Sequence, residues 1–158
     1  MNDFDFLVGT WDVSNRWLAD FLDADSGWEA FPAVSRATRH FGGAASFDEI
    51  EFPTKGFAGM TLRLYEPERE QWTLNWANRR TGTLFPPVTG GFDPATGTGV
   101  FEGEDTYGGK AVRVRFVWSR TEADSPRWEQ FFSADGAEKN WVHNWTMDFS
   151  RRAADAAA

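Results

Sequence analysis

The segment Ala111–Ser119 has the sequence AVRVRFVWS, in which large apolar side chains occupy every second position. The even-numbered residues from 112 to 118 are all apolar, whereas Arg113 and Arg115 lie between them. Successive side chains of a β-strand point to opposite faces, so this pattern predicts a strand with one buried and one solvated face. Strands of this kind form antiparallel sheets that cover an apolar core. The segment therefore indicates an all-β fold.

The same two-residue period continues through most of the chain, interrupted by clusters of Gly, Pro, Asp and Asn. Short strands separated by turns at this spacing are typical of a sandwich or a barrel. The predicted strands are Thr10–Phe21, Ser35–Phe41, Ser46–Phe52, Gly59–Tyr65, Trp72–Asn78, Gly82–Phe85, Val88–Phe92, Val100–Thr106, Ala111–Ser119, Trp128–Ser133 and Val142–Ser150. We predict a single antiparallel up-and-down β-barrel of about eight to ten strands. A short helical turn within Asn2–Val8 is expected to precede it.

The length of 158 residues fits one domain. We assign residues 1–152 to the barrel and expect residues 153–158, which are small and mostly apolar, to form a disordered tail. The N-terminal sequence lacks the basic and apolar regions of a signal peptide. No apolar run reaches the roughly 18 residues of a membrane span, so we expect a cytoplasmic protein.

Alternate residues of each strand should face the barrel interior. The residues predicted to face inward are Trp11, Val13, Asn15 and Trp17; Met60, Leu62 and Leu64; Trp72, Leu74 and Trp76; Val112, Val114, Phe116 and Trp118; Trp128, Gln130 and Phe132; and Trp141, His143, Trp145, Met147 and Phe149. Arg63 is predicted to face outward. A buried polar group without a partner costs about 1–3 kcal/mol. We therefore expect Asn15, Gln130 and His143 to bond to one another, to indole N–H groups, to water or to a ligand.

Charge and composition narrow the possible functions. The net charge is −8, which repels phosphate groups, so we expect neither nucleic acid nor an anionic membrane as a partner. Cysteine is absent, which excludes disulfides and thiolate metal sites. Aromatic residues make up 16% of the chain, with nine Trp and fifteen Phe. This content is compatible with a heavily aromatic core, with an aromatic-lined cavity, or with both.

The two ends of the barrel sequence carry a resemblance to the calycin superfamily. Gly9-Thr10-Trp11 looks like the Gly-x-Trp at the start of a calycin barrel, and Arg151 or Arg152 stands where an Arg packs across that Trp. The chain also resembles an uncharacterised bacterial family of lipocalin-like domains. The matching segments are Phe4–Val13, Leu62–Tyr65, Gln71–Trp72, Leu84–Val88, Val112–Phe116, Arg127–Gln130 and Asn144–Phe149. The resemblance implies a barrel with a cavity, closed at one end by Trp11 and Arg151, and implies no particular activity.

Two classes of function remain open. In the first, the barrel binds a small hydrophobic or aromatic molecule as a carrier or sensor. The predicted ligand-binding residues are Asn15, Trp17, Leu62, Trp76, Phe116, Gln130, His143 and Trp145. In the second, the barrel is a cofactor-independent enzyme, such as a cyclase, isomerase or dehydratase, that acts on a hydrophobic substrate held between aromatic walls. The candidate catalytic residues are His143, His40 and Gln130.

A minor alternative is a haem-binding barrel with His143 or His40 as the iron ligand. We otherwise expect no cofactor and no metal site, because two His and no Cys supply few ligands for a transition metal. Outward-facing Arg113 and Arg115 beside acidic segments suggest complementary patches. Closed dimers are the commonest assemblies, so we predict a homodimer.

Overall fold

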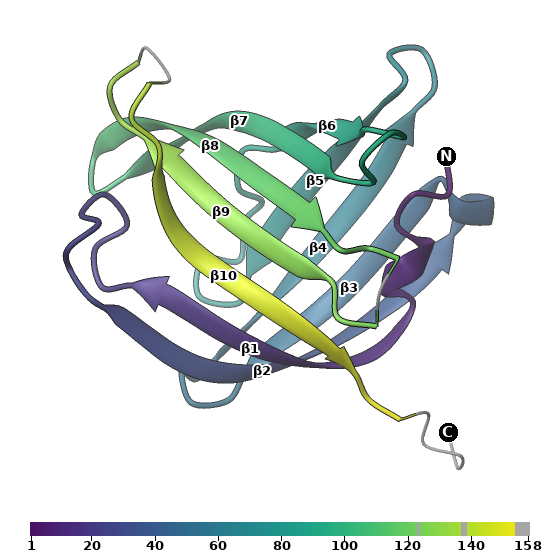
Figure 1. Ribbon diagram of the computed structural model, residues 1–158, viewed down its shortest axis with the longest axis horizontal. Coiled ribbons are helices and arrows are strands. Elements are labelled where there is room, and N and C mark those ends of the chain that lie inside the picture. Colours follow the sequence, from purple (N-terminus) through teal and green to yellow (C-terminus); the bar gives the residue numbers. More distant parts are fainter. Residues whose placement is uncertain (123, 137–138, 154–158) are drawn as a thin grey trace.

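A computed structural model describes residues 1–122, 124–136 and 139–153 of the chain. Within these residues, ten antiparallel strands close into a barrel in which each strand pairs with the next and β10 pairs with β1 (Figure 1). The elements are η1 (Asp5–Leu7), β1 (Gly9–Leu18), β2 (Trp28–His40), η2 (Phe41–Gly43), β3 (Ala45–Phe52), β4 (Phe57–Glu66), β5 (Gln71–Asn78), β6 (Val88–Phe92), β7 (Gly99–Tyr107), β8 (Lys110–Ser119), β9 (Arg127–Ser133) and β10 (Val142–Arg151), where η denotes a 3₁₀ helix. The predicted all-β, up-and-down barrel and its short N-terminal helical turn are confirmed.

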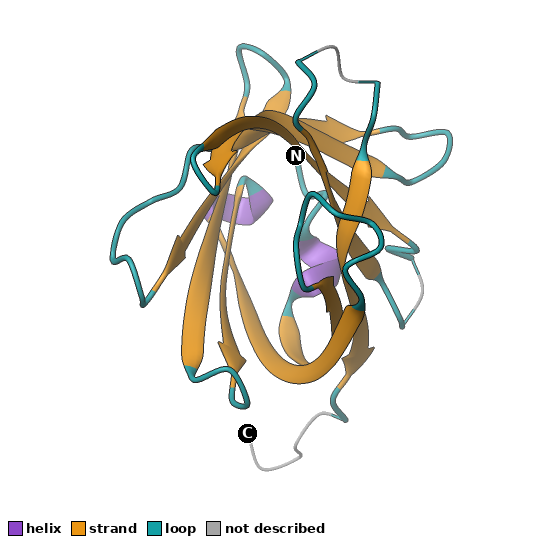
Figure 2. Cartoon of the chain, turned by 90° about the vertical axis from the view of Figure 1, so that its left-hand side faces the viewer, coloured by secondary structure: helices purple, strands orange, loops and turns teal. Residues whose placement is uncertain are grey.

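The two ends of the barrel differ. Residues 1–8, including η1, lie at one end, which we call the closed end (Figure 1). The connections that follow β1, β3, β5, β7 and β9 gather at the other end, which we call the open end. Figure 2 looks toward the open end, with the short helices behind the nearest loops. The N-terminal segment is thus the element that covers one opening of the sheet.

Trp11 is the centre of the closed end. Its side chain is almost fully buried, and its indole Nε1 donates to the Leu7 carbonyl at 2.7 Å. The Arg151 guanidinium lies over the Trp11 ring, 4.1 Å from the ring centre, and donates to the Val8 carbonyl at 2.7 Å. The contact between Trp11 and Arg151 was predicted from the sequence, and the two residues are also paired across β1 and β10.

Two strand predictions need correction. Gly82–Phe85 is not a strand, since only a single bridge joins Leu84 to Ala77. Strand β2 begins at Trp28 rather than Ser35, although Pro32 interrupts the sequence pattern. Pro32 lies in the part of β2 that pairs with β1 alone, because pairing with β3 starts at Val34. A proline has no backbone N–H to donate. It is tolerated at this position because no second neighbouring strand needs a hydrogen bond from it.

The predicted facing of β4 is wrong. Arg63 is 4% exposed and faces the interior, whereas Met60 and Leu62 are on the outer surface at 45% and 39% exposure. The interior positions of this strand are Gly59, Thr61 and Arg63. Gly59 is required because a Cβ there would come within 2.0 Å of the Trp76 ring. The middle of the strand therefore gives the interior an open surface and a charge, and places Met60 and Leu62 outside.

The predicted facing of the start of β10 is also wrong, because the strand contains a β-bulge. His143 pairs with Phe131, but the next pair joins Trp145 to Gln130, so Asn144 is an additional residue. An extra residue reverses the alternation on one side of the bulge. His143 and Trp141 therefore lie outside, where they contact Phe131 and Arg115, while Trp145, Met147 and Phe149 remain inside as predicted.

In the described part of the chain, no helix has both the length and the apolar character needed to cross a bilayer. Residues 154–158, which form most of the predicted tail, are outside the described residues.

Candidate functional site

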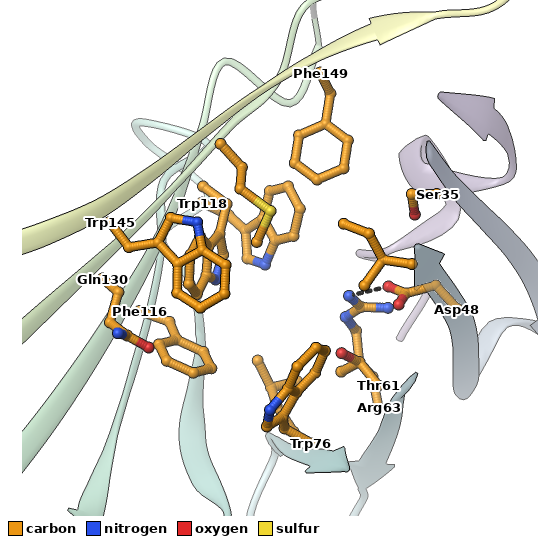
Figure 3. Close-up of a pocket in the computed structure, with 14 residues that line it drawn as sticks. Ser35, Asp48, Thr61, Arg63, Trp76, Phe116, Trp118, Gln130, Trp145 and Phe149 are labelled. Carbon is orange, nitrogen blue, oxygen red and sulfur yellow. Dashed lines mark hydrogen bonds and ion pairs between the residues drawn. The ribbon is translucent and has the colours of Figure 1, made fainter. Parts of the chain in front are cut away.

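A cavity of about 70 Å³ lies inside the barrel and has two chemically different walls (Figure 3). One wall consists mainly of rings and other apolar side chains from β5, β8, β9 and β10, with Gln130 as its polar member. The other wall is polar and comes from β2, β3 and β4. The lining residues are Ser35, Asp48, Ile50, Thr61, Arg63, Leu74, Trp76, Phe116, Trp118, Trp128, Gln130, Trp145, Met147 and Phe149. We call this space the inner cavity.

The aromatic wall is a rigid array of rings that meet edge to face. Trp128 lies 5.2 Å from Trp145 at an interplanar angle of 89°, and 5.0 Å from Phe116. Such edge contacts contribute about 0.5–1.5 kcal/mol each beyond the burial of area. The indole Nε1 of Trp145 donates to Asn15 Oδ1 at 3.0 Å, which fixes the ring from behind. The wall is therefore held in shape before any ligand enters.

The polar wall is built around a buried ion pair. Arg63 Nη2 lies 2.5 Å from Asp48 Oδ2, and Arg63 Nη1 donates to Ser46 Oγ at 3.3 Å. Both members of the pair are more than nine-tenths buried. The guanidinium also lies over the Phe4 ring, 5.1 Å from its centre. Burying two charges is tolerated because they neutralise each other and because the Ser46 hydroxyl accepts a further hydrogen bond from the guanidinium.

One donor of Arg63 has no partner. Its Nε is buried and makes no hydrogen bond within the described part of the chain. A buried, unsatisfied N–H group is costly, on the order of 1–3 kcal/mol, and more when the donor is charged. Figure 3 shows the Arg63 side chain between Asp48 and the aromatic wall, at the edge of the inner cavity. Arg63 lines the inner cavity, so a ligand held there contacts the side chain that carries this unpaired donor.

A second, larger cavity of about 280 Å³ leads from the inner cavity to the open end. Both cavities are lined by Leu74, Trp76, Phe116, Gln130 and Trp145. The larger cavity also contacts side chains near the open-end loops. These include Trp17, Phe21, Phe57, Arg80, Phe85, Asp105 and Tyr107. We call this space the outer cavity. It lies between the inner cavity and the open end.

A short hydrogen-bond chain joins the wall of the barrel to the β1–β2 loop. Gln130 Nε2 donates to Asn144 Oδ1 at 3.0 Å, and Asn144 Nδ2 donates to the Phe21 carbonyl at 3.2 Å. The Phe21 amide in turn donates to the Tyr107 hydroxyl at 3.1 Å. The Phe21 and Tyr107 rings are stacked at 5.5 Å. Phe21 therefore lies across the outer cavity and is fixed from both sides.

Asn144 was not predicted as a site residue. Strict alternation along β10 places it outside, and only the bulge turns it inward beside Trp145. The spacing of Val142 and Trp145 is the available signal, because both face inward although they are three positions apart. A strand with uninterrupted alternation would place these two residues on opposite faces.

The predicted ligand-binding residues divide into three groups. Trp17, Trp76, Phe116, Gln130 and Trp145 line one or both cavities. Asn15 is fully buried but lies behind the wall, where it accepts the indole hydrogen bond of Trp145. Leu62 and His143 are on the outer surface, so the predicted position of both inside the barrel is wrong.

His143 lies in a cluster on the outer face. Its Nε2 is 3.2 Å from Glu129 Oε2 and 2.8 Å from Thr146 Oγ1, and its ring stacks on Phe131. Burial lowers the pKa of His143 below its ordinary value of 6.5, and Glu129 acts in the opposite direction. Both polar contacts fall on the same ring nitrogen. A hydrogen bond with the backbone of Trp145 also acts to raise the pKa of His143, so three neighbours hold the ring on the outer face.

The other two catalytic candidates are also placed by the structure. His40 is exposed at the end of β2, where its Nε2 lies 2.8 Å from Thr38 Oγ1. Gln130 faces both cavities and is hydrogen-bonded to Asn144. The chain has two histidines, and neither faces the interior. A haem inside the barrel would thus lack the histidine ligand on which that alternative depends.

The acidic and histidine side chains of the described residues form no group of three or more that could hold a metal ion. The inner cavity offers aromatic surface and the Arg63–Asp48 ion pair, and the outer cavity adds the charged side chains of Arg80 and Asp105. Comparison of the chain with protein-family models gives no match. A search of the curated proteins likewise finds no relative.

Proposed function

We propose that the barrel binds a small hydrophobic or aromatic molecule, and that it is a calycin-type barrel. The proposal on the fold type is supported by Gly9-Thr10-Trp11 at the start of β1 and by Arg151 stacked on Trp11. The single observation that carries the proposed function is the aromatic wall shared by the inner and outer cavities. Together the cavities, of about 70 and 280 Å³, fall at the lower end of the size range of small-molecule sites, which begins at roughly 300 Å³.

Binding is favoured over catalysis by the position of the titratable candidates. His143 and His40 are on the outer surface, so neither is within reach of a molecule in the cavities. Gln130 is within reach, but an amide does not titrate in the range of a general acid or base. The titratable side chains that line the cavities are engaged within the fold. Asp48 is ion-paired with Arg63. Asp105 accepts from the Thr106 amide, and the Tyr107 hydroxyl accepts from the Phe21 amide.

Access is proposed to run through the open end. Phe21 and Tyr107 lie in the path, and both are only partly buried. A ligand enters when the hydrogen bond and the ring stack between Phe21 and Tyr107 break as the β1–β2 loop moves. The ligand then packs against Phe116 and Trp145. Loops of this kind open on the nanosecond to microsecond scale or slower, which is compatible with reversible binding.

The test is a fluorescence titration with N-phenyl-1-naphthylamine, an apolar probe that brightens in a nonpolar site. We expect saturable binding with a dissociation constant in roughly the micromolar range. The Phe116→Ala variant removes a ring from the cavity wall and should weaken binding by up to about tenfold.

Phe131→Ala is the matched control, because Phe131 is on the neighbouring strand but faces outward against His143. It should leave the affinity unchanged. If the probe does not bind, or if both variants weaken it equally, the proposal that the ligand lies inside the barrel is wrong.

A further inference from the structure

We infer that the molecule held in this barrel is an uncharged aromatic compound with a hydrogen-bond-accepting oxygen on its edge, a ketone, quinone or phenol rather than a carboxylate, and that Arg63 receives this oxygen. The inference rests on the proposed function and specifies the ligand class of the same site. It starts from the polarity of the inner cavity, which has rings on one side and Arg63 with Asp48 on the other (Figure 3).

The unpartnered donor determines which kind of atom fits. Arg63 Nε is buried without a hydrogen-bond partner, in a side chain that is 4% exposed and lines the inner cavity. A ligand oxygen that accepts from Nε removes the penalty of an unsatisfied buried donor. A purely hydrocarbon ligand fills the same space and leaves that penalty in place. The site therefore discriminates in favour of a ligand with an acceptor.

The ion pair determines the charge of that acceptor. Arg63 is already neutralised by Asp48 at 2.5 Å, so the polar wall as a whole carries no net charge. A carboxylate would bring a second negative charge into a space that is enclosed by rings and already holds the Asp48 carboxylate. The free energy lost with its hydration would not be offset, because Arg63 is already paired with Asp48. A carbonyl or hydroxyl oxygen loses far less hydration and gains the same hydrogen bond.

The aromatic wall determines the rest of the molecule. Trp128, Trp145 and Phe116 face the polar wall across the cavity and present ring edges and faces. Flat ligands use such surfaces with little loss of side-chain entropy, because the rings are already fixed by one another. The hydroxyl of Thr61 also lines the cavity and provides a second polar contact for the same edge of the ligand.

The experiment compares three probes of one ring size by calorimetry or by quenching of tryptophan fluorescence: naphthalene, 2-acetylnaphthalene and 2-naphthoate. We expect 2-acetylnaphthalene to bind on the order of tenfold more tightly than naphthalene, as one additional hydrogen bond from a charged donor implies. The naphthoate should bind no more tightly than naphthalene. In addition, the carbonyl stretch of bound 2-acetylnaphthalene should shift to lower frequency than in hexane.

A double variant, Arg63→Met with Asp48→Leu, removes the ion pair and keeps the volume apolar. It should retain naphthalene binding and lose the preference for the ketone. Replacing both members of a buried pair is tolerated better than removing one. The matched control is Arg115→Met with Glu102→Leu, which removes a pair of 2.6 Å on the outer face of the barrel. That variant should keep the preference.

The outcomes separate this inference from the proposed function. Binding of naphthalene and 2-acetylnaphthalene with equal affinity, or tightest binding of the naphthoate, overturns the inference and leaves a hydrophobic site in place. Absence of binding by all three probes overturns both. If the double variant does not fold, the affinity ratio and the carbonyl shift in the unmodified protein still decide the question.

Discussion

The two ends of this barrel are built differently. At the closed end, Phe4, Leu7, Trp11 and Trp72 are each at most 2% exposed. Both indole N–H groups are satisfied there, Trp11 by the Leu7 carbonyl and Trp72 by Asp3 at 2.8 Å. Phe4 meets Trp72 edge to face at 4.9 Å. This end is packed as a conventional protein core.

At the open end, several side chains around the outer cavity are only partly buried. Phe21 depends on the Tyr107 hydroxyl and on Asn144, and Leu84 is 69% exposed. The outer cavity lies among these residues. The difference indicates a division of roles along one sheet, in which one end supplies stability and the other admits the ligand. The following predictions test that division, from the largest effect to the smallest.

The largest effect is expected from a matched pair of leucine substitutions, one at each end. Leu7→Ala removes a side chain that is 1% exposed in the closed end and should lower the free energy of unfolding by about 2–5 kcal/mol. Leu84→Ala removes a side chain at the open end and should change it by no more than about 0.5 kcal/mol. Urea unfolding followed by tryptophan fluorescence measures both. Equal losses would contradict the assignment of stability to the closed end.

A smaller effect is expected from Tyr107→Phe, which removes the acceptor of the Phe21 amide hydrogen bond and keeps the ring stack. Stability should fall by roughly 0.5–1.5 kcal/mol. The Phe21 amide should exchange its hydrogen faster, and a bound probe should dissociate faster, because the β1–β2 loop is less restrained.

Tyr65→Phe is the control for that variant, since it makes the same chemical change near the closed end, beside Trp72. Exchange at Phe21 should not respond to it. Unchanged exchange in Tyr107→Phe would mean that the Phe21 carbonyl bond to Asn144 is sufficient to hold the loop.

The smallest effect is the dependence of stability on pH that His143 causes on the outer face near the open end. Burial lowers the pKa of His143, with Arg16 and Arg127 acting in the same direction and Glu129 opposing them. The unfolded chain therefore takes up this proton first as the pH falls. The contribution of His143 to stability is complete above its unfolded pKa of about 6.5 and declines from there down to the folded pKa.

His143→Gln removes this dependence and keeps a hydrogen-bonding side chain. Unfolding curves of both proteins between about pH 7 and pH 5 should show a smaller slope of stability against pH in the variant. Identical slopes would show that the imidazole titrates alike in the folded and unfolded chain.

The regular parts of the barrel were predictable from the sequence because the two-residue period decides them. On strands β1, β5, β8 and β9 the large apolar residues predicted to face inward occupy alternate positions, and those residues are inside. Five of the predicted ligand-binding residues line the cavities for the same reason: Trp17, Trp76, Phe116, Gln130 and Trp145. The homodimer and the cytoplasmic location stay predictions.

The polar half of the inner cavity was not predictable from hydropathy alone. On β4 the apolar Met60 and Leu62 alternate with Arg63, and a charge is ordinarily assigned to the solvated face. The opposite facing depends on a partner in another strand, Asp48, which shares the inner face of β3 with Ile50. An ion pair between two strands cannot be recognised from the alternation of apolar and polar residues in either strand. The bulge at Asn144 has the same character, because one extra residue changes the facing of everything before it.

The ring of strands also has a consequence for how the chain folds. Nine of its pairings join consecutive strands, whereas the tenth, between β1 and β10, brings together residues such as Asp12 and Arg152 that are 140 positions apart. Local hairpins form first because short loops cost less entropy to close. Until the final pairing forms, β1 and β10 are exposed edges that another chain could extend. The pairing of β1 with β10 is therefore the step at which folding competes with aggregation. The stack of Arg151 on Trp11 joins these two strands.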